Sequence, residues 1–175
     1  FDSTLKLLYE TPLPDPSARQ ILAPYTNVEV AARLEAVRAS GRTLLTEFES
    51  KELLRAYGIP VTQTEVATTA EEAVEAADRI GYPVVVKLHS QVITHKSDIG
   101  GVLLNVRDAQ AVRAAFAQIT TNAIKVRPDA HINGVSVESM LMHENARETM
   151  VGMIRDPVFG PAITFGAGGT AVETM

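Results

Sequence analysis

Hydrophobic and polar residues follow two different periods along the chain, and each period predicts one type of element. Apolar residues spaced three or four apart predict helices, whereas short apolar or alternating runs predict strands. The helical pattern occurs at residues 27–39, 46–57, 69–80 and 108–124. The strand pattern occurs at residues 61–67, 83–88, 102–106, 134–141, 148–154 and 162–165. Strands interspersed with helices in this way are typical of an α/β sandwich rather than of a helical bundle or a barrel.

Local signals mark the starts of three predicted helices. Thr46 is followed by Glu49, the spacing of a capping box, in which a hydroxyl and a carboxylate satisfy free amides at a helix start. Thr69 and Asp108 are N-cap candidates for the next two helices. The run at residues 83–88 is almost continuously apolar, so we expect this strand to be covered on both faces.

The first 42 residues differ from the rest and predict a connector. A short helix is predicted at residues 1–10, and residues 11–24 carry four prolines. Proline lacks an N–H donor and restricts its predecessor, so this stretch predicts an extended linker. We therefore divide the chain into a connector at residues 1–42 (helix, proline-rich linker, helix) and a main domain at residues 43–175. Because the chain starts with Phe1 rather than Met and stops soon after a glycine-rich segment, we expect a fragment of a longer polypeptide or a short subunit that has lost its first residues.

Composition narrows the class of protein. The 175 residues are 46% hydrophobic and 21% charged, which is typical of a soluble globular protein. The net charge of −5 argues against broad nucleic-acid binding, which needs a basic face. No cysteine is present, so disulfides and thiolate metal sites are excluded. No apolar run approaches the ~20 residues of a membrane span, and no secretory signal is visible, so we expect a cytoplasmic protein with no membrane partner.

Lys87 and His95 are the residues that most suggest chemistry. Lys87 lies near the end of a buried strand, where its compact ammonium can hold a phosphate; the alternative is a solvated lysine at a strand end. His95 lies in the polar segment THKSDIGG, where an imidazole can act as acid, base or nucleophile near neutral pH. Lys96 can offset the charge of a phosphorylated ring and Asp98 can orient it. The alternative is an exposed loop histidine.

Two other segments are candidates for a nucleotide site. Residues 165–169 (FGAGG) predict a glycine-rich turn whose amides can surround a phosphate, although many tight turns have the same sequence. The alternating strand that ends with Glu138, Ser139 and Met140 can offer backbone groups to an adenine and an acid to a ribose. The alternative is a half-buried strand with polar residues outward, and Glu148 has the same ambiguity. Together with Lys87, these segments suggest phosphoryl chemistry on a nucleotide.

Five motifs occur in an order that resembles a known family: LTEFESKELLRAYGIPV, GYPVVVKLHS, HKSDIGGV, GVSVESM and RDPVFGPAITFGAGG. Over residues 43–175 the chain resembles the ATP-grasp domain of the nucleoside-diphosphate-forming acyl-CoA (acetyl-CoA) synthetases, which are relatives of succinyl-CoA synthetase. The same domain occurs in large bacterial protein lysine acetyltransferases. The resemblance implies an ATP-grasp-type α+β sandwich that is incomplete at its C-terminal end. It would comprise the N-terminal subdomain and the start of the second lobe, preceded by the helical, proline-rich connector.

The resemblance also implies an activity, that of an acid–thiol ligase. The family couples cleavage of an acyl-CoA thioester to synthesis of ATP from ADP and phosphate, reversibly and through phosphohistidine. By position, His95 resembles the histidine that receives phosphate close to the nucleotide, and Lys87 resembles the lysine that contacts the nucleotide phosphates. Seven further residues resemble the nucleotide site: the adenine-reading hinge of Glu138, Ser139 and Met140, the following acid Glu148, and the glycine turn of Gly166, Gly168 and Gly169.

Some features of the family pattern are changed or missing. The family usually has a glutamate directly before the hinge methionine, where this chain has Ser139; Glu138 faces the opposite side of the strand and cannot simply replace it. The resemblance places the ligands of Mg²⁺, which accompanies ATP or ADP, beyond residue 175, so no metal ligand is assigned in this chain. The implied partners are an acyl-CoA substrate and the CoA-binding and ligase domains of the same polypeptide or a partner subunit. The alternative function is a nucleotide- or acyl-CoA-sensing regulatory domain of a protein lysine acetyltransferase.

Overall fold

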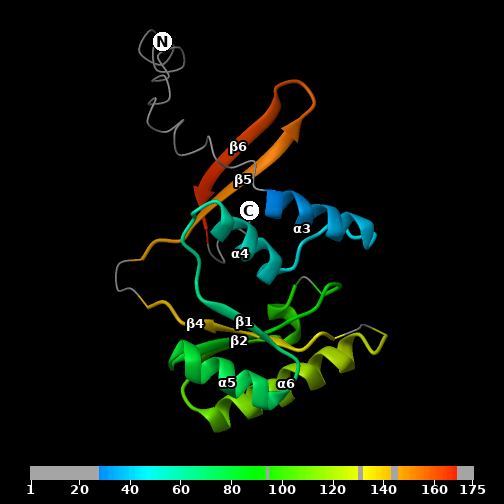
Figure 1. Cartoon of the computed structure of the whole chain (residues 1–175). Helices are drawn as coiled ribbons and strands as arrows, with labels where there is room; N and C mark the ends of the chain where they lie inside the picture. The colour runs from blue at the N-terminus through cyan, green and yellow to red at the C-terminus, as the bar shows by residue number, and fades with distance from the viewer. Residues whose placement is uncertain (1–27, 94, 130–131, 143–145, 169–175) are drawn as a thin grey trace. The chain divides into compact units, whose positions relative to one another are not determined.

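The chain forms two compact units, residues 1–140 and residues 141–175. The computed structural model in Figure 1 describes residues 28–93, 95–129, 132–142 and 146–168. The helix predicted at residues 1–10 and the proline-rich linker lie outside the described residues. The first part of the connector therefore stays a prediction.

The first unit is built on a four-stranded sheet in which every neighbouring pair of strands is antiparallel. The strand order is β1-β4-β2-β3, so the two central strands come from separate parts of the chain. The strands are β1 (Thr64–Ala67), β2 (Val84–Leu88), β3 (Val102–Val106) and β4 (Val135–Ser139). All four lie within predicted strand runs. β1 is shorter than its predicted run because only its four residues lie opposite β4.

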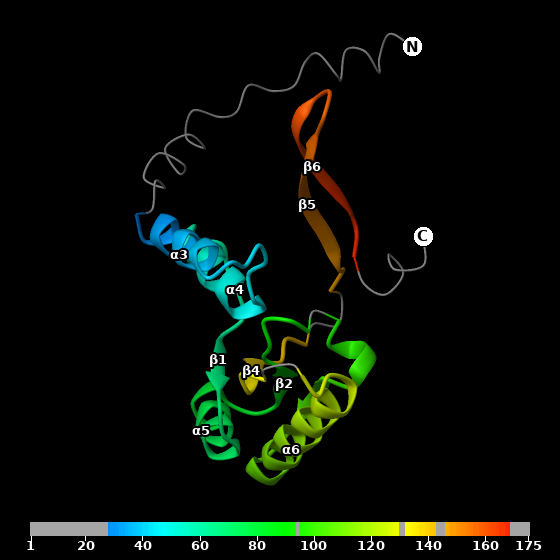
Figure 2. The same ribbon diagram turned by 90° about the vertical axis from the view of Figure 1, so that its right-hand side faces the viewer.

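Helices α5 (Ala70–Ile80) and α6 (Ala109–Val126) cover one face of this sheet, as Figures 1 and 2 show from two directions. Alternate side chains of the central strands point into the layer between sheet and helices. The buried residues of this layer include Ala73, Ala77, Val84, Val86, Leu88, Val112, Ala115, Ile119, Val135 and Val137. Burying one such aliphatic side chain contributes about 1.5–3 kcal/mol, so this layer is the main source of stability in the unit.

Two further helices, α3 (Val28–Ala39) and α4 (Glu47–Ala56), precede the sheet in the sequence. The predicted capping box at the start of α4 is confirmed. The Thr46 hydroxyl accepts a hydrogen bond from the N–H of Glu49 at 3.2 Å, and the Glu49 carboxylate accepts one from the N–H of Thr46 at 2.7 Å. The N-caps predicted for α5 and α6 are confirmed as well. These caps fix the first residue of each helix.

The second unit contains an antiparallel hairpin of β5 (Thr149–Asp156) and β6 (Gly160–Ala167). A turn that begins at Asp156 joins the two strands. The Asp156 carboxylate accepts hydrogen bonds from the N–H groups of Val158 and Phe159, both at 2.8 Å. A short aspartate that bonds to the backbone two and three residues ahead is a common way to hold such a turn.

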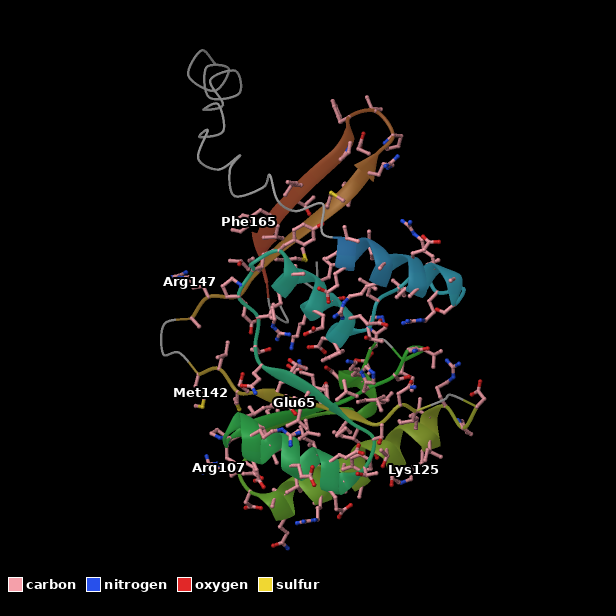
Figure 3. The ribbon with its side chains drawn as sticks, viewed as in Figure 1. Glu65, Arg107, Lys125, Met142, Arg147 and Phe165 are labelled. Atoms are coloured by element: carbon pink, nitrogen blue, oxygen red, sulfur yellow. The ribbon has the colours of Figure 1, made fainter. Side chains whose placement is uncertain are left out.

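The end of β6 corrects one prediction. We expected a glycine-rich turn at residues 165–169, but β6 continues through Ala167, with Gly166 opposite Met150. The ladder with β5 supplies hydrogen-bond partners to backbone groups that a turn would leave free, so the segment stays extended. One face of the hairpin presents exposed apolar side chains, those of Val151, Met153, Ile163 and Phe165, the last of which is labelled in Figure 3.

We predict that Gly134→Ala strongly destabilises the first unit. Gly134 has a φ of +105°, and a Cβ added to it would lie 2.0 Å from the carbonyl oxygen of Ala67. Because that oxygen belongs to the backbone at the end of β1, relieving the overlap must disturb the sheet. We expect the free energy of unfolding to fall by about 1–3 kcal/mol beyond the cost of the positive φ.

Gly81→Ala is the matched control for this prediction. Gly81 has a similar φ of +91°, but a Cβ there would meet nothing within 4 Å, so this variant reports backbone strain alone. Urea unfolding followed by circular dichroism measures both variants. Equal losses of stability in the two variants would contradict the argument.

Candidate functional site

Lys87 lies on β2 and points to the face of the sheet opposite the apolar core. Its neighbours Val86 and Leu88 are buried in that core, and side chains alternate along a strand. The Nζ atom of Lys87 lies 2.6 Å from Oε1 of Glu47 and 2.9 Å from Oε2 of Glu138. The lysine predicted to bind phosphate is therefore paired with two carboxylates of its own chain.

Glu47 and Glu138 join three lysines in one group of charges. Lys51 Nζ lies 2.7 Å from Oε2 of Glu138 and 3.3 Å from Oε1 of Glu47, and Lys96 Nζ lies 3.1 Å from Oε2 of Glu47. We call these five residues, Glu47, Lys51, Lys87, Lys96 and Glu138, the lysine–glutamate cluster. Its three ammonium groups and two carboxylates sum to a net charge of +1. An excess of positive charge at one place favours the binding of an anion.

The cluster is assembled from elements that lie apart in the sequence. Helix α4 contributes Glu47 and Lys51, which are four residues apart and so share one helix face. Strands β2 and β4 contribute Lys87 and Glu138, and the loop after β2 contributes Lys96. Glu47 and Lys51 are not among the residues that the sequence predicts for the site. One sequence signal does point to this pair. The two residues have opposite charges at i, i+4 spacing, and Glu47 directly follows the capping residue Thr46.

Pairing keeps Glu47 and Lys87 charged. Burial raises the pKa of the Glu47 carboxyl, but the hydrogen bond from Lys87 and the charges of the three lysines outweigh it and hold this pKa at about 2. Burial lowers the pKa of Lys87, yet its hydrogen bonds to Glu47 and Glu138 raise it above the ordinary value. Both groups are therefore ionised near neutral pH.

His95 lies in the segment between β2 and β3, and it is exposed. This segment also contains a short 3-10 helix, η1 (Ser97–Ile99), which was not predicted, and Gly100 ends it with a φ of +64°. Lys96, the next residue after His95, donates a hydrogen bond to Glu47 at 3.1 Å. We expected Lys96 to offset charge on a phosphorylated ring; in this structure its ammonium instead ties the His95 loop to α4.

The predicted hinge residues lie at the end of β4 and point in different directions. Glu138 is 3% exposed and lies on the Lys87 face of the sheet, where Ser136 Oγ also donates to it at 3.4 Å. Ser139 is the next residue of the strand and points to the other face. Met140 accepts a weak hydrogen bond at its sulfur from the N–H of Asn105, at 3.2 Å. The structure therefore brings Glu138, but not Ser139, to Lys87, and the hinge role of all three stays a prediction.

The remaining candidate residues belong to the second unit. The N–H of Gly168 donates to the carbonyl oxygen of Glu148 at 2.9 Å, so these two residues lie side by side at the open end of the hairpin. Gly166 lies within β6, and Gly169 lies outside the described residues. Their roles in a nucleotide site also stay predictions.

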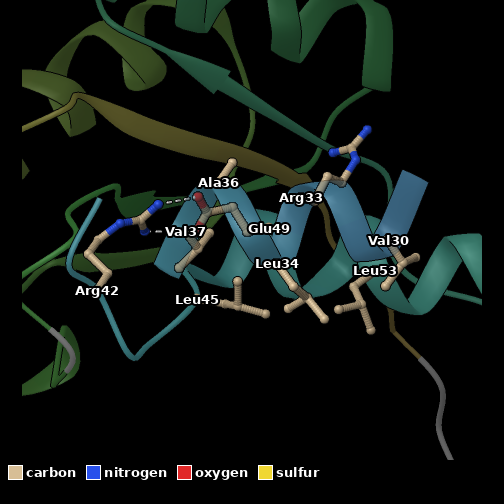
Figure 4. Close-up of a pocket in the computed structure, with 9 residues that line it drawn as sticks. All are labelled: Val30, Arg33, Leu34, Ala36, Val37, Arg42, Leu45, Glu49 and Leu53. Atoms are coloured by element: carbon tan, nitrogen blue, oxygen red, sulfur yellow. Dashed lines mark hydrogen bonds and ion pairs between the residues drawn. The ribbon is translucent and has the colours of Figure 1, made fainter. Parts of the chain in front are cut away.

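A cavity of about 220 Å³ lies between α3 and α4 (Figure 4). Its apolar lining includes Val37 and Leu53, and the Arg42 guanidinium at its rim donates to both oxygens of Glu49, at 2.8 and 3.0 Å. Glu49 and Leu53 are each two positions beyond the cluster residues of α4, which is about 200° around a helix. This cavity therefore faces away from the lysine–glutamate cluster.

The described part of the chain contains neither a metal-binding cluster nor a membrane-spanning helix. No three or more histidine, aspartate or glutamate side chains there come together as they would around a metal ion. None of the described helices combines the length and apolar character needed to cross a membrane.

Comparison with known proteins defines the class of this protein. The model of the ATP-grasp domain family matches residues 36–175, and the chain belongs to that family. The ATP-grasp fold and the resemblance predicted from the sequence are thus confirmed.

Several relatives of the chain are ADP-forming CoA ligases. The chain is 49% identical over 142 residues to the beta subunit of ADP-forming acetate–CoA ligase I of Pyrococcus furiosus, covering 81% of this chain and 60% of that protein. The structure is similar to that of acetyl-coenzyme A synthetase 1 of Ca. Korarchaeum cryptofilum in complex with coenzyme A and Ca-AMPCP (TM-score 0.74, 41% identity, 78% of this chain and 58% of that chain).

A second structure of the Korarchaeum enzyme contains coenzyme A and Mg-AMPPCP, with its phosphohistidine segment pointing towards the nucleotide binding site (TM-score 0.68, 36% identity, 83% of this chain and 60% of that chain). The chain thus spans about 60% of the length of the relatives that it matches.

We predict that acid weakens the first unit through Glu47. The pKa of Glu47, about 2 in the folded chain, lies below its ordinary value of 4.5. Its ion pairs therefore contribute stability that is complete above pH 4.5 and is lost as the pH falls toward 2. Glu47→Gln should remove on the order of 1–2 kcal/mol of this pH-dependent stability, a figure reduced for solvent screening of a partly exposed carboxylate.

Urea unfolding at several pH values across this window, at low salt, measures the effect. The curve of stability against pH should be flatter for Glu47→Gln than for the wild type. Parallel curves would show that Glu47 is not the group responsible.

Proposed function

We propose that this chain is the ATP-grasp part of an ADP-forming acyl-CoA synthetase. The overall reaction converts acyl-CoA, ADP and phosphate into the free acid, CoA and ATP, and it is reversible. The observation that carries the proposal is the 49% identity over 142 residues to a ligase beta subunit of this type. Because the chain spans 60% of that relative, the proposal assigns to it the nucleotide-handling step and not the whole reaction.

In this proposal Lys87 binds the phosphates of the nucleotide. Two features of the structure support this role: the excess positive charge of the lysine–glutamate cluster, and the position of Lys87 on a central strand that packing holds firmly. An ammonium donating to a phosphate oxygen makes a charge-assisted hydrogen bond, which is about twice as strong as a neutral one. Positive charge fixed before the reaction also stabilises the charge spread over a phosphoryl group in transit.

His95 is the proposed carrier of phosphate to the nucleotide. A terminal phosphate oxygen of ADP attacks the phosphorus on the imidazole ring; a P–O bond forms, the P–N bond breaks, and its electron pair returns to the ring nitrogen. The exposure of His95 supports this role, because the phosphoryl group must reach it from another domain. Partner domains that bind CoA and the acyl group belong to the same proposal, in line with the subunit names of the relatives.

The other nucleotide contacts are assigned by the family resemblance. Adenine and ribose contacts fall to Glu138, Ser139 and Met140, an acidic role to Glu148, and phosphate contacts to Gly166, Gly168 and Gly169. The carboxylate of Glu138 is already paired with Lys51 and Lys87, so we assign it to holding Lys87 rather than to a ribose.

Magnesium is proposed to accompany the nucleotide, as Mg-AMPPCP does in the similar Korarchaeum structure. The described carboxylates nearest Lys87 do not fit a magnesium site. Glu47 and Glu138 each face lysine ammonium groups within 3.3 Å, and these would repel a divalent cation. The family resemblance places the magnesium ligands beyond residue 175, and no step of the proposal is assigned to the metal.

We predict that His95→Ala abolishes phosphoenzyme formation at this loop and leaves ADP binding intact. The full native polypeptide is incubated with γ-labelled ATP and Mg²⁺, and acid-labile, base-stable label on the protein is counted. Gln91→Ala, an exposed residue of the same loop, is the control and should keep the label. Label that persists in His95→Ala would exclude His95 as the carrier. Nucleotide binding without any label in the wild type would instead favour a sensing domain.

We predict that Lys87→Met weakens ADP binding by about 10- to 100-fold, the effect of losing one hydrogen bond between charged groups. Isothermal titration calorimetry measures the affinity, and a thermal melt confirms that the variant is folded. Lys125→Met, an exposed lysine in the last turn of α6 that is labelled in Figure 3, is the control. If Lys87→Met binds ADP as tightly as the control does, the assigned role of Lys87 is wrong.

A further inference from the structure

We propose that Glu47 is an exchangeable internal anion, which holds the ammonium groups of Lys87 and Lys96 together and yields them to the phosphates of an incoming nucleotide. This inference rests on the proposed function and adds a residue to it. Glu47 would set the strength and the charge preference of nucleotide binding without belonging to the nucleotide contacts that the family resemblance assigns.

The geometry of Glu47 suits this role. One carboxylate oxygen accepts a hydrogen bond from Lys87 at 2.6 Å, and the other accepts one from Lys96 at 3.1 Å. Two oxygens of one anionic group thus bridge two ammonium groups from different segments. The oxygens of a phosphate can make the same bridge, because lysine binds carboxylate and phosphate alike as a compact point charge.

Glu47, rather than Glu138, is the carboxylate that can leave. The Glu47 side chain is 33% exposed and lies at the first residue of α4, so it can turn toward water without unfolding the helix. The Glu138 side chain is 4% exposed on a central strand, where no water can replace its lysine partners. Lys51 also stays on Glu138 at 2.7 Å when Lys87 turns to another anion.

The exchange changes the charge that the nucleotide meets. With Glu47 in place the cluster carries +1, and without it the remaining three lysines and one carboxylate carry +2. A phosphate chain brings more negative charge than the carboxylate that it displaces, whereas a nucleoside brings none. Glu47 therefore competes with ligands that carry phosphates and weakens their binding, whereas it leaves the binding of an uncharged nucleoside unchanged.

The exchange also affects the loop that contains His95, the predicted phosphate carrier. Lys96 is bonded to Glu47 and directly follows His95 in the loop. In the exchange the ammonium of Lys96, the residue next to His95, passes from Glu47 to the phosphates of the nucleotide.

The test uses Glu47→Gln in the full chain, with ADP, pyrophosphate and adenosine as probes in isothermal titration calorimetry at low salt. Removing one negative charge from a partly exposed site should tighten ADP and pyrophosphate by about five- to tenfold. Adenosine should bind as it does to the wild type, and the gain should shrink as salt is added. Glu65→Gln is the matched control. Glu65 pairs with Arg79 at 2.7 Å and lies on the face of β1 that points away from the lysine–glutamate cluster.

Each outcome of these titrations either supports the inference or shows that it is wrong. If Glu47→Gln binds ADP and pyrophosphate less tightly than the wild type, or equally, Glu47 is not a displaced anion and the inference is wrong, while the proposed nucleotide function stands. If no form binds ADP but pyrophosphate binds more tightly to Glu47→Gln, the exchange stands and the nucleotide function fails. If neither probe binds to any form, both fail.

A second variant keeps the test decisive where Glu47→Gln does not fold. Glu47→Asp retains the charge but shortens the side chain by one methylene, which draws the carboxylate away from Lys87 and Lys96. We expect the affinities of Glu47→Asp for ADP and pyrophosphate to lie between those of the wild type and those of a variant with an uncharged residue at position 47. Affinities at or below the wild-type values in a variant that melts normally would overturn the inference.

Discussion

The pairing of Glu138 is the constraint on which both the fold and the candidate site depend. Its side chain is 4% exposed on a central strand, and an ionised carboxylate in such a place costs several kcal/mol unless it is paired. Lys87 of the neighbouring strand and Lys51 of α4 supply the partners at 2.9 and 2.7 Å. Because one partner comes from a helix, this requirement draws α4 onto the face of the sheet that α5 and α6 leave open.

A buried ion pair is a weak source of net stability, since desolvation offsets most of the attraction between the charges. Packed apolar residues at the positions of Lys87 and Glu138 would serve the fold at least as well. Removing one partner is nevertheless costly, about 3–5 kcal/mol, because it strands the other charge. The cluster is therefore better explained by anion binding at Lys87 than by stability, and Glu138 is the carboxylate that makes a lysine tolerable on this strand.

Most described elements could be predicted from the sequence, because periodicity and capping act within one turn or one strand. The capping box of α4 is such a local signal. The lysine–glutamate cluster could not be predicted in the same way, since Glu47 meets Lys87 and Lys96 across 40 and 49 residues of sequence, where only the assembled sheet decides which side chains are neighbours. Gly166 was placed in a turn for a related reason. Its glycine-rich surroundings suggested a bend, but pairing with β5 keeps it extended.

The charge of the whole chain and the charge of the site have opposite signs. The chain carries −5, yet the proposed ligand is an anion and the cluster that would meet it carries +1. These facts are compatible because salt screens exposed charges beyond about 8–10 Å, whereas partly buried charges in contact are screened far less. The local arrangement of three lysines and two glutamates, and not the net charge, then decides what binds. A chain of net negative charge also weakly repels polyanions such as nucleic acids, which must contact a broad area, while a nucleotide needs only the lysine–glutamate cluster.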